Sequence, residues 1–308
     1  KDQGKLLPVL LELDGATHLV PDAYTISVAA TGIILRGANS RGVLYAVYAF
    51  LEALGCLWTY PTAGEEIVPT RDPLYLDCGE WAAAPGIAHR GLGLYGLDAN
   101  SVDLGRDMID WMAKNRLNLV LTSADRQDEP TRTQAMHWPE VADVLLPEIR
   151  KRGMILEHSE HMTHLFFPPE LFDQHPDWFA LIGGVRARRQ MCFANRAAVE
   201  YFAARLADYA VAHPEIRLLG TWPLDGGGYC ECAACRKPDV PFRAVCRMAE
   251  AVALVRPDLT IEYLAYTPQT LPVPTTEPPR PNMSALVCDR LDDAARGWVA
   301  RMRAARGA

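Results

Sequence analysis

Carboxylate, histidine and aromatic side chains recur where short apolar segments of this sequence end. The candidate catalytic residues are Asp225, Glu231, Glu262 and Asp289, and the candidate substrate-binding residues are Arg90, His161, His164, Trp222, Tyr229 and Tyr266. Cleavage of a sugar linkage needs an acid for the leaving oxygen and a second carboxylate as nucleophile or base, with aromatic faces against the ring. A lone Asp after a strand is more often a turn former or helix cap, so the prediction depends on their convergence.

The first 80 residues predict a small α/β domain with a structural role. Two strands, Tyr24–Val28 and Ile33–Leu35, have a link short enough for a hairpin. Ser40 is expected to cap a helix that Gly55 ends. The further strands expected here are Leu57–Tyr60 and Leu74–Leu76.

From about residue 86 the pattern alternates between strand and helix. The candidate strands are His89–Leu94, Leu117–Thr122, Met154–Glu157, Leu218–Trp222, Ile261–Tyr266 and Ala285–Asp289; the candidate helices are Leu104–Asn115, Pro139–Arg152 (broken at Pro147), Ala197–Ala212, Phe242–Val255 and a last one near Arg301. The fold class is therefore α/β, with a TIM-type (β/α) barrel over residues 86–308. Six strands are visible where a full barrel needs about eight, so we expect an incomplete barrel.

Barrel active sites form at the carboxyl ends of the strands, which would bring Arg90, His161 and Asp225 to one rim. A buried Arg90 guanidinium needs acceptors, and Asp225 or a bound sugar would supply them. The alternative is that Arg90 pairs with a surface carboxylate and that His161 is solvated on a loop.

Three cysteines, Cys230, Cys232 and Cys235, cluster in a glycine-rich loop beside the predicted site. Thiolates at this spacing can hold structural zinc, but such a site needs about four ligands. Cys246 or Cys192 would complete it. A disulfide and free thiols are the alternatives. Zinc would fix the loop rather than take part in the chemistry, for which no cofactor is required.

A histidine run, His158-x-x-His161-x-x-His164, lies after the third predicted barrel strand. It differs from the His-Glu-x-x-His pattern of zinc proteases, which lies within a helix. We expect His161 and His164 to hydrogen-bond to substrate, with a metal site as the alternative.

Two parts of the sequence resemble known families. Residues 22–54, with the helical run Arg41–Gly55, resemble the non-catalytic N-terminal domain of β-N-acetylhexosaminidases and α-glucuronidases. The remainder is similar to a bacterial family known as domain of unknown function 4838, considered glycosidase-like. The blocks that carry this similarity are His161–His164 with Pro169–Leu181, Cys192–Asn195, and Asp225–Cys232.

The resemblance implies a hexosaminidase-like barrel in which Arg90 binds sugar hydroxyls. It also implies that His161 and Asp225 lie where the hexosaminidase catalytic residues lie. Hexosaminidases carry an adjacent Asp-Glu pair at this point, whereas Asp225 is followed by Gly226. Substrate-assisted cleavage of an N-acetyl sugar is therefore not expected, and the partner carboxylate must be Glu231, Glu262 or Asp289.

Charge and hydropathy argue against two classes of partner, nucleic acids and membranes. The net charge is −7 and basic residues do not form runs, which argues against nucleic acid. No apolar run approaches the ~18 residues of a membrane span. Localisation is open, with secreted or periplasmic favoured over cytoplasmic. The sequence thus predicts a bacterial-type glycoside hydrolase acting on poly- or oligosaccharide, or alternatively a catalytically inactive carbohydrate-binding barrel.

Overall fold

The computed structural model describes residues 7–15, 20–62, 64–70, 75–95, 97–123, 138–159, 161, 163–288 and 293–305. The chain divides into two compact units, one of residues 1–121 with 137–155 and the other of residues 122–136 with 156–308. The predicted domain boundary between residues 80 and 86 stays a prediction.

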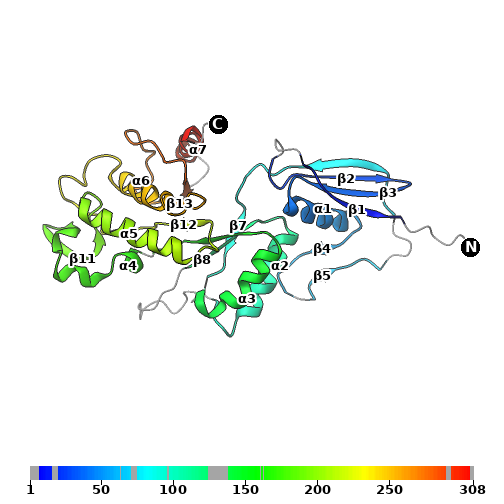
Figure 1. Cartoon of the computed structure of the whole chain (residues 1–308), viewed down its shortest axis with the longest axis horizontal. Coiled ribbons are helices and arrows are strands. Elements are labelled where there is room, and N and C mark those ends of the chain that lie inside the picture. Colours follow the sequence, from blue (N-terminus) through cyan, green and yellow to red (C-terminus); the bar gives the residue numbers. More distant parts are fainter. Residues whose placement is uncertain are drawn as a thin grey trace, which may run out of the picture. The chain divides into compact units, whose positions relative to one another are not determined.

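The first unit begins with a four-stranded sheet and one helix, α1 (Ser40–Ala53). In sheet order the strands are β1 (Val9–Leu13), β3 (Gly32–Gly37), β2 (Tyr24–Ala29) and β6 (Gly79–Ala83). β2 and β3 pair antiparallel, as the predicted hairpin requires, and β1 runs parallel to β3 (Figure 1). Ile26, Leu35 and Ala46 are the most deeply buried residues of the core between sheet and helix.

The start of α1 differs from the sequence prediction. Asn39, not Ser40, is the N-cap, and its side chain accepts a hydrogen bond from Gly42 N at 2.7 Å. Gly37 lies so close to this first turn that a Cβ there would be 2.0 Å from Val43 N. The helix therefore begins directly against the end of β3.

The expected strand at Leu74–Leu76 is wrong for Tyr75 and Leu76, which the structure leaves outside any strand, while Leu74 lies outside the described residues. β6 takes the fourth place in the sheet, because its backbone pairs with β2 from Tyr24↔Ala83 to Val28↔Gly79. The segment at Leu57 does form a strand, β4 (Leu57–Trp58), which pairs with β5 (Glu66–Ile67).

All six strands predicted beyond residue 86 are present in one parallel sheet. Their order is β7 (Gly91–Gly93), β8 (Leu119–Thr122), β9 (Ile155–His158), β12 (Leu218–Gly220), β13 (Thr260–Ala265) and β14 (Met283–Val287). The sheet is curled, and the fold is mixed α/β. Every residue of β12 is buried, as are five of the six in β13, which explains their continuous apolar sequences.

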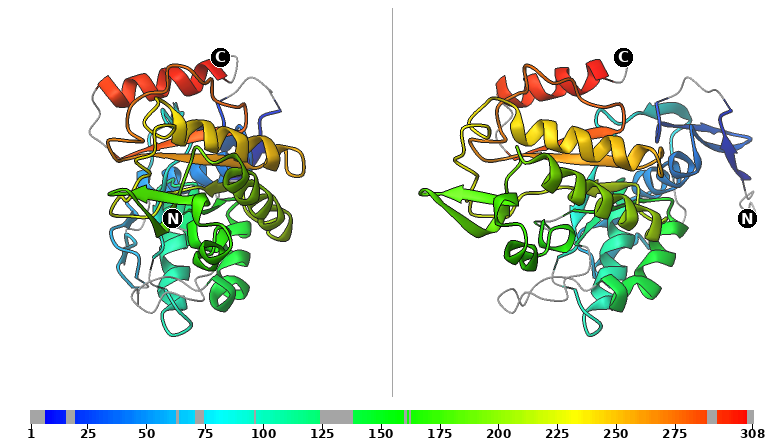
Figure 2. Two further views of the ribbon diagram at one scale, coloured as in Figure 1. Left: turned by 90° about the vertical axis from the view of Figure 1, so that its left-hand side faces the viewer. Right: turned by 60° about the vertical axis from the view of Figure 1, so that its left-hand side comes forward.

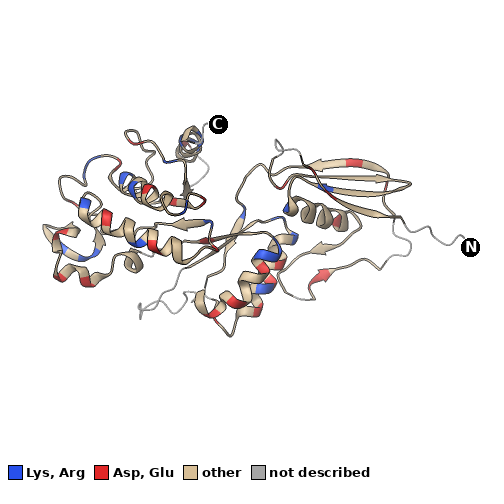
Figure 3. Ribbon diagram, viewed as in Figure 1, with Lys and Arg blue, Asp and Glu red and all other residues tan. Residues whose placement is uncertain are grey.

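Helices alternate with these strands as predicted. The first unit holds α2 (Val102–Lys114) and α3 (Trp138–Lys151), and the second holds α5 (Arg196–Ala212), α6 (Val240–Ala253) and α7 (Asp293–Ala305). Figure 2 shows α5 and α6 side by side in the second unit. On the described helices acidic and basic residues are interspersed (Figure 3).

The predicted break at Pro147 is wrong, since α3 continues through it. Proline removes the hydrogen bond to the carbonyl of Asp143. Both residues are on the exposed side of α3, so that water can satisfy the carbonyl. On the other side Val141, Leu145 and Ile149 are buried and hold the helix in place.

Between β9 and α5 lies a segment that the sequence left as a loop. It contains α4 (Thr163–Phe166), two short 3₁₀ turns, η1 (Pro169–Asp173) and η2 (Pro176–Trp178), and a hairpin of β10 (Phe179–Ile182) and β11 (Val185–Met191). Phe166, Phe167 and Phe179 are buried, which identifies these aromatics as packing residues. None of the helices in the described part of the chain has the length and hydropathy needed to cross a membrane.

Candidate active site

The carboxyl ends of β9, β12 and β13 bring several polar side chains of the second unit together. Ser159 and His161 follow β9, and Trp222 and Asp225 follow β12, the strand between β9 and β13. Glu262 lies within β13, next to β12 in the sheet. This is the rim that the parallel topology predicts, for the residues contributed by these three strands.

Trp222 is held over Glu262 by a direct hydrogen bond. The indole Nε1 donates to Glu262 Oε1 at 3.0 Å. Gly220 leaves the space for this contact, because a Cβ there would lie 2.4 Å from Ser159 Oγ and 2.9 Å from Trp222 Nε1. The absence of a side chain at Gly220 is therefore a requirement of the site.

Glu262 shares its surroundings with a second buried carboxyl, Glu157 of β9. Glu157 pairs with Leu218 and Glu262 with Gly220, two positions that lie on the same face of β12. Burial and the nearby charge of Glu157 raise the pKa of Glu262 well above its usual value. Burial raises the pKa of Glu157 as well. The pair therefore holds a proton to a higher pH than exposed carboxyl groups do.

His161 and Asp225 lie next to each other on the rim. The ring Nδ1 contacts the carbonyl oxygen of Pro223, which can only accept, so Nδ1 carries a proton. Nε2 then faces Asp225 Oδ1 at 4.0 Å. The ring also packs edge-on against Trp222, with centroids 5.5 Å apart. Asp225 is partly exposed, with 42% of its side chain accessible, so a ligand can reach it.

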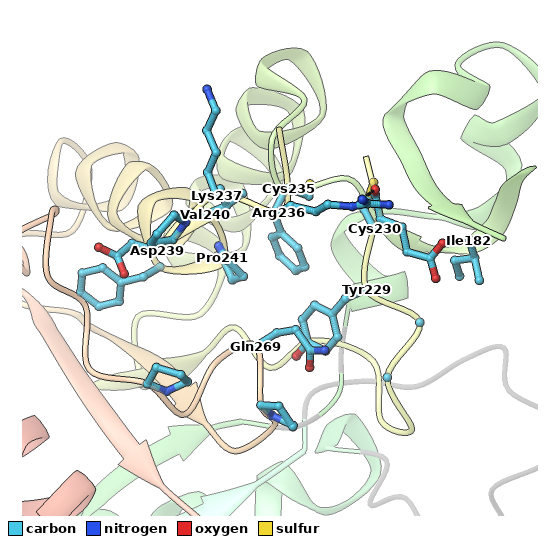
Figure 4. Close-up of a pocket in the computed structure, with 18 of the residues that line it drawn as sticks. Ile182, Tyr229, Cys230, Cys235, Arg236, Lys237, Asp239, Val240, Pro241 and Gln269 are labelled. Carbon is cyan, nitrogen blue, oxygen red and sulfur yellow. Dashed lines mark hydrogen bonds between the residues drawn. The ribbon is translucent and has the colours of Figure 1, made fainter. Parts of the chain in front are cut away.

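A glycine-rich loop follows Asp225, and its residues 227–229 line a cavity of about 680 Å³. Tyr229 and Gln269 line one side of it and Arg236 and Pro241 the other (Figure 4). The hydroxyl of Tyr229 accepts a hydrogen bond from Thr267 Oγ1 at 3.1 Å, which fixes the ring at the cavity wall.

The remaining predicted residues lie in different settings. Glu231 lines this cavity, and its Oε2 accepts a hydrogen bond from Gly183 N, in the turn of the β10–β11 hairpin, at 2.9 Å. Tyr266 is 46% exposed just beyond β13. His164 lies in α4. Asp289 is outside the described residues.

Arg90 belongs to the first unit and has its own acceptors there. It precedes β7, at the amino end of a parallel strand, whereas His161 and Asp225 follow the carboxyl ends of theirs. Its acceptors are Asp22 Oδ2, at 3.0 Å, and the carbonyls of residues 87, 88 and 116. Neither Asp225 nor a sugar is needed to satisfy the guanidinium.

Asp22 is the centre of this separate polar cluster. Its buried carboxylate also accepts hydrogen bonds from Asn39, Arg41 and Asn118. With Arg90, the carboxylate has four partners, all in the first unit. Asn39 and Arg41 lie at the start of α1, and Arg90 and Asn118 directly precede β7 and β8. The structure thus pairs Arg90 with Asp22 and not with Asp225, while the shared pocket of Arg90, His161 and Asp225 stays a prediction.

The predicted cysteine cluster exists and gains a fourth member. Cys230, Cys232 and Cys235 meet Cys192, which follows β11, and the four sulfurs all lie within 4.8 Å of one another. Cys246 is elsewhere, with its thiol donating to Pro278 O. In the described part of the chain this is the one group of His, Cys, Asp and Glu within metal-binding distance.

The histidine run does not converge on a metal in this geometry. His158 is buried and its Nδ1 lies 2.8 Å from Tyr209 Oη, while His161 contacts Pro223. Burial lowers the pKa of His158 to about 3, so this ring is neutral.

The family described as "Domain of unknown function (DUF4838)" matches residues 60–298. The chain belongs to this family. A comparison with curated proteins finds no match.

This DUF4838 protein has the fold of β-N-acetylhexosaminidase structures. It matches the N-acetyl-β-hexosaminidase of Streptomyces plicatus (16% identity, TM-score 0.58, 97% of this chain and 60% of that one) and the GH20 enzyme of Streptomyces coelicolor A3(2) (15%, 0.57, 96% and 60%). It also matches the Bacteroides fragilis β-N-acetylhexosaminidase (15%, 0.54, 90% and 57%). At these identities the likeness shows the fold alone, a glycoside-hydrolase-like one. The chain spans about three fifths of these structures.

Two residues of the DUF4838 site were missed from the sequence. Glu157 ends the apolar run Met154–Leu156, and a carboxylate inside a buried strand was the available signal. Gly220 carried no signal, because a glycine's need for space depends on neighbours from other strands.

Proposed function

We propose that this chain hydrolyses O-glycosidic bonds of an oligo- or polysaccharide at the rim formed by β9, β12 and β13. The observation that carries the proposal is that Asp225, a partly exposed carboxyl group, lies next to the imidazole of His161, which packs against the indole of Trp222. A carboxyl group and an aromatic face at the carboxyl ends of parallel strands are two of the parts that glycoside cleavage uses, and a second carboxylate is the third. The glycoside-hydrolase-like fold supports the same reading, and we propose that the curled sheet forms part of a (β/α) barrel.

Asp225 acts as the general acid in this proposal. His161 holds its Nδ1 proton on Pro223 O and presents Nε2 toward Asp225, so an imidazolium protonated at Nε2 can pair with the carboxylate that forms once Asp225 has given its proton to the leaving oxygen. The acid protonates the leaving oxygen as the glycosidic bond breaks, and a second carboxylate acts as nucleophile or as base toward water. Glu231 and Asp289 are the candidates for that second group.

Glu262 takes a positioning role. It is buried and accepts a hydrogen bond from Trp222, and burial raises its pKa and so favours its neutral form. It therefore holds the indole rather than attacking a sugar. Trp222 and Tyr266 then offer faces for ring stacking, and Tyr229 and Glu231 line the neighbouring cavity. We propose a carbohydrate without an N-acetyl requirement, because Asp225 is followed by Gly226 rather than by a glutamate.

The test is a screen of chromogenic glycosides and polysaccharides with the wild type, Asp225→Asn and a matched control. Asp208→Asn is suitable as control, because Asp208 is an exposed residue of α5 that pairs only with Arg205 at the surface. Turnover that Asp225→Asn lowers by about 10²-fold or more, and that Asp208→Asn leaves unchanged, supports the proposal. Sugar binding without turnover by the wild type would instead establish the catalytically inactive binding module.

A further inference from the structure

The four clustered cysteines lie at separations that suit one tetrahedral ion. The Sγ of Cys192 is 3.5 Å from that of Cys230, 3.9 Å from that of Cys232 and 3.6 Å from that of Cys235. Zinc–thiolate bonds of about 2.3 Å in a tetrahedron place neighbouring sulfurs about 3.8 Å apart. A disulfide would need a pair at about 2.05 Å. The cluster is therefore spaced for a shared ion rather than for a covalent bond.

From this spacing we propose that Cys192, Cys230, Cys232 and Cys235 bind one structural zinc ion. All four ligands come from the protein, which leaves no position for substrate or water and assigns the ion a structural rather than a catalytic task. Zinc favours such a soft tetrathiolate set. The site is independent of the proposed glycoside hydrolysis.

The surroundings of the sulfurs are those of ligating thiolates. Leu181 N donates to Cys230 Sγ at 3.3 Å, and Cys235 N donates to Cys232 Sγ at 3.4 Å. Arg186 Nη1 lies 3.9 Å from Cys230 Sγ. Backbone donors and a cation beside the sulfurs orient thiolates and offset the charge of about −2 that four thiolates and Zn²⁺ carry. The protein itself makes all three of these contacts to the sulfurs.

The ion would join two parts of the second unit that are far apart in sequence. Cys192 follows β11 of the hairpin, and the other three ligands lie in the loop between β12 and α6. The described part of this local core has three buried residues, Ala180, Cys192 and Cys230, and Leu181 and Ile182 pack against them while only partly buried. The loop also contains Gly226, Gly227 and Gly228, all with positive φ. A metal cross-link would restrict a loop whose three glycines allow it many conformations.

The same cross-link would shape the cavity. Tyr229 and Glu231 flank Cys230, and both line the cavity; Figure 4 shows Tyr229 and Cys230 there. Glu231 N donates to Leu181 O at 2.8 Å, which ties the loop to β10 on the same side. The ion therefore fixes the wall formed by residues 229–236, and its loss should loosen that wall first.

The first measurement is metal content of the full chain, purified without added metal, together with thiol titration in denaturant. We expect one zinc per chain and, after chelation, all eight thiols free. Cys192→Ser and Cys235→Ser should each lower the zinc content. Cys246→Ser is the control matched to Cys192→Ser, because Cys246 is also buried but lies outside the cluster, and it should keep one zinc.

A second measurement keeps the test decisive if the serine variants fail to fold. Wild-type protein reconstituted with Co²⁺ should show the visible spectrum of a tetrahedral tetrathiolate complex. Trypsin should cleave after Arg236 in the chelated protein at least about tenfold faster than in the zinc form, because the loop opens locally. Absence of zinc, iron in its place, six free thiols instead of eight, or equal proteolysis of the two forms would each overturn the proposal.

Discussion

Trp222 and Glu262 are joined by a hydrogen bond in which the indole Nε1 donates to the carboxyl Oε1 at 3.0 Å. The bond runs from the exposed rim to a buried carboxyl on the neighbouring strand, and Glu157 lies beyond it on β9. The orientation of a candidate sugar platform is thus coupled to the protonation of a buried acid pair. The raised pKa values of Glu262 and Glu157 should make the stability of the protein depend on pH.

The first prediction concerns the pH dependence of stability. Because burial raises the pKa of Glu262 in the folded state, the unfolded chain releases this proton first as the pH rises. The contribution to the free energy of unfolding is therefore full below about pH 4.3 and is lost as the pH rises toward the folded pKa, by up to about 1.4 kcal/mol per pH unit. Glu262→Gln should remove this loss and keep an acceptor for Trp222. Urea denaturation between about pH 5 and 8 measures it.

The control for this profile is Glu170→Gln, at an exposed residue of η1. It should follow the wild type at every pH. A difference between Glu262→Gln and wild type that stays constant with pH would show that the carboxyl ionises normally.

The second prediction is an opposite pH effect at His158. Burial lowers its pKa to about 3, so its contribution to stability is present above the unfolded value of about 6.5 and is lost as the pH falls toward 3. The imidazole should remain neutral at about pH 5. NMR of the ring nitrogens measures this, with His158→Gln to assign the signals. A titration midpoint near 6.5 would contradict the buried, neutral assignment.

The third prediction concerns the space at Gly220. Gly220→Ala should lower the free energy of unfolding by about 1–3 kcal/mol, because the new methyl group would overlap Ser159 and Trp222. It should also displace the indole, which tryptophan fluorescence would detect. Gly79→Ala, on β6 with open space around its Cα, is the matched control and should change stability by less than about 1 kcal/mol. Equal effects of the two variants would mean that the space at Gly220 is not needed.

The fourth prediction separates structure from binding at Arg90. Arg90→Ala should lower stability by about 1–3 kcal/mol, because buried Asp22 loses a charged donor. It should leave sugar affinity unchanged. Arg36→Ala removes an exposed ion pair with Glu12 in the same unit and should cost about 1 kcal/mol or less. If Arg90→Ala lost sugar binding at unchanged stability, Arg90 would be a sugar-binding residue and not a structural one.

The sequence by itself determined the alternation of strands and helices, the hairpin of β2 and β3, and the six strands of the parallel sheet. These features depend on local periodicity and turn residues, which a single segment carries. It also placed Asp225 and His161 at strand ends, where topology alone brings them to one rim. It could not exclude a break at Pro147, because which side of a helix faces water depends on its packing.

Only the tertiary structure decided which side chains meet. Cys192 joined the cysteine cluster, rather than Cys246, through a hairpin whose strands the sequence did not indicate. Arg90 met Asp22, a residue 68 positions away, and not Asp225. Glu157 and Glu262 became a pair through their register with β12. The physical reason is common to all three: hydrogen bonds, ion pairs and shared protons act over a few ångströms, and those distances are set by how segments far apart in the chain pack together.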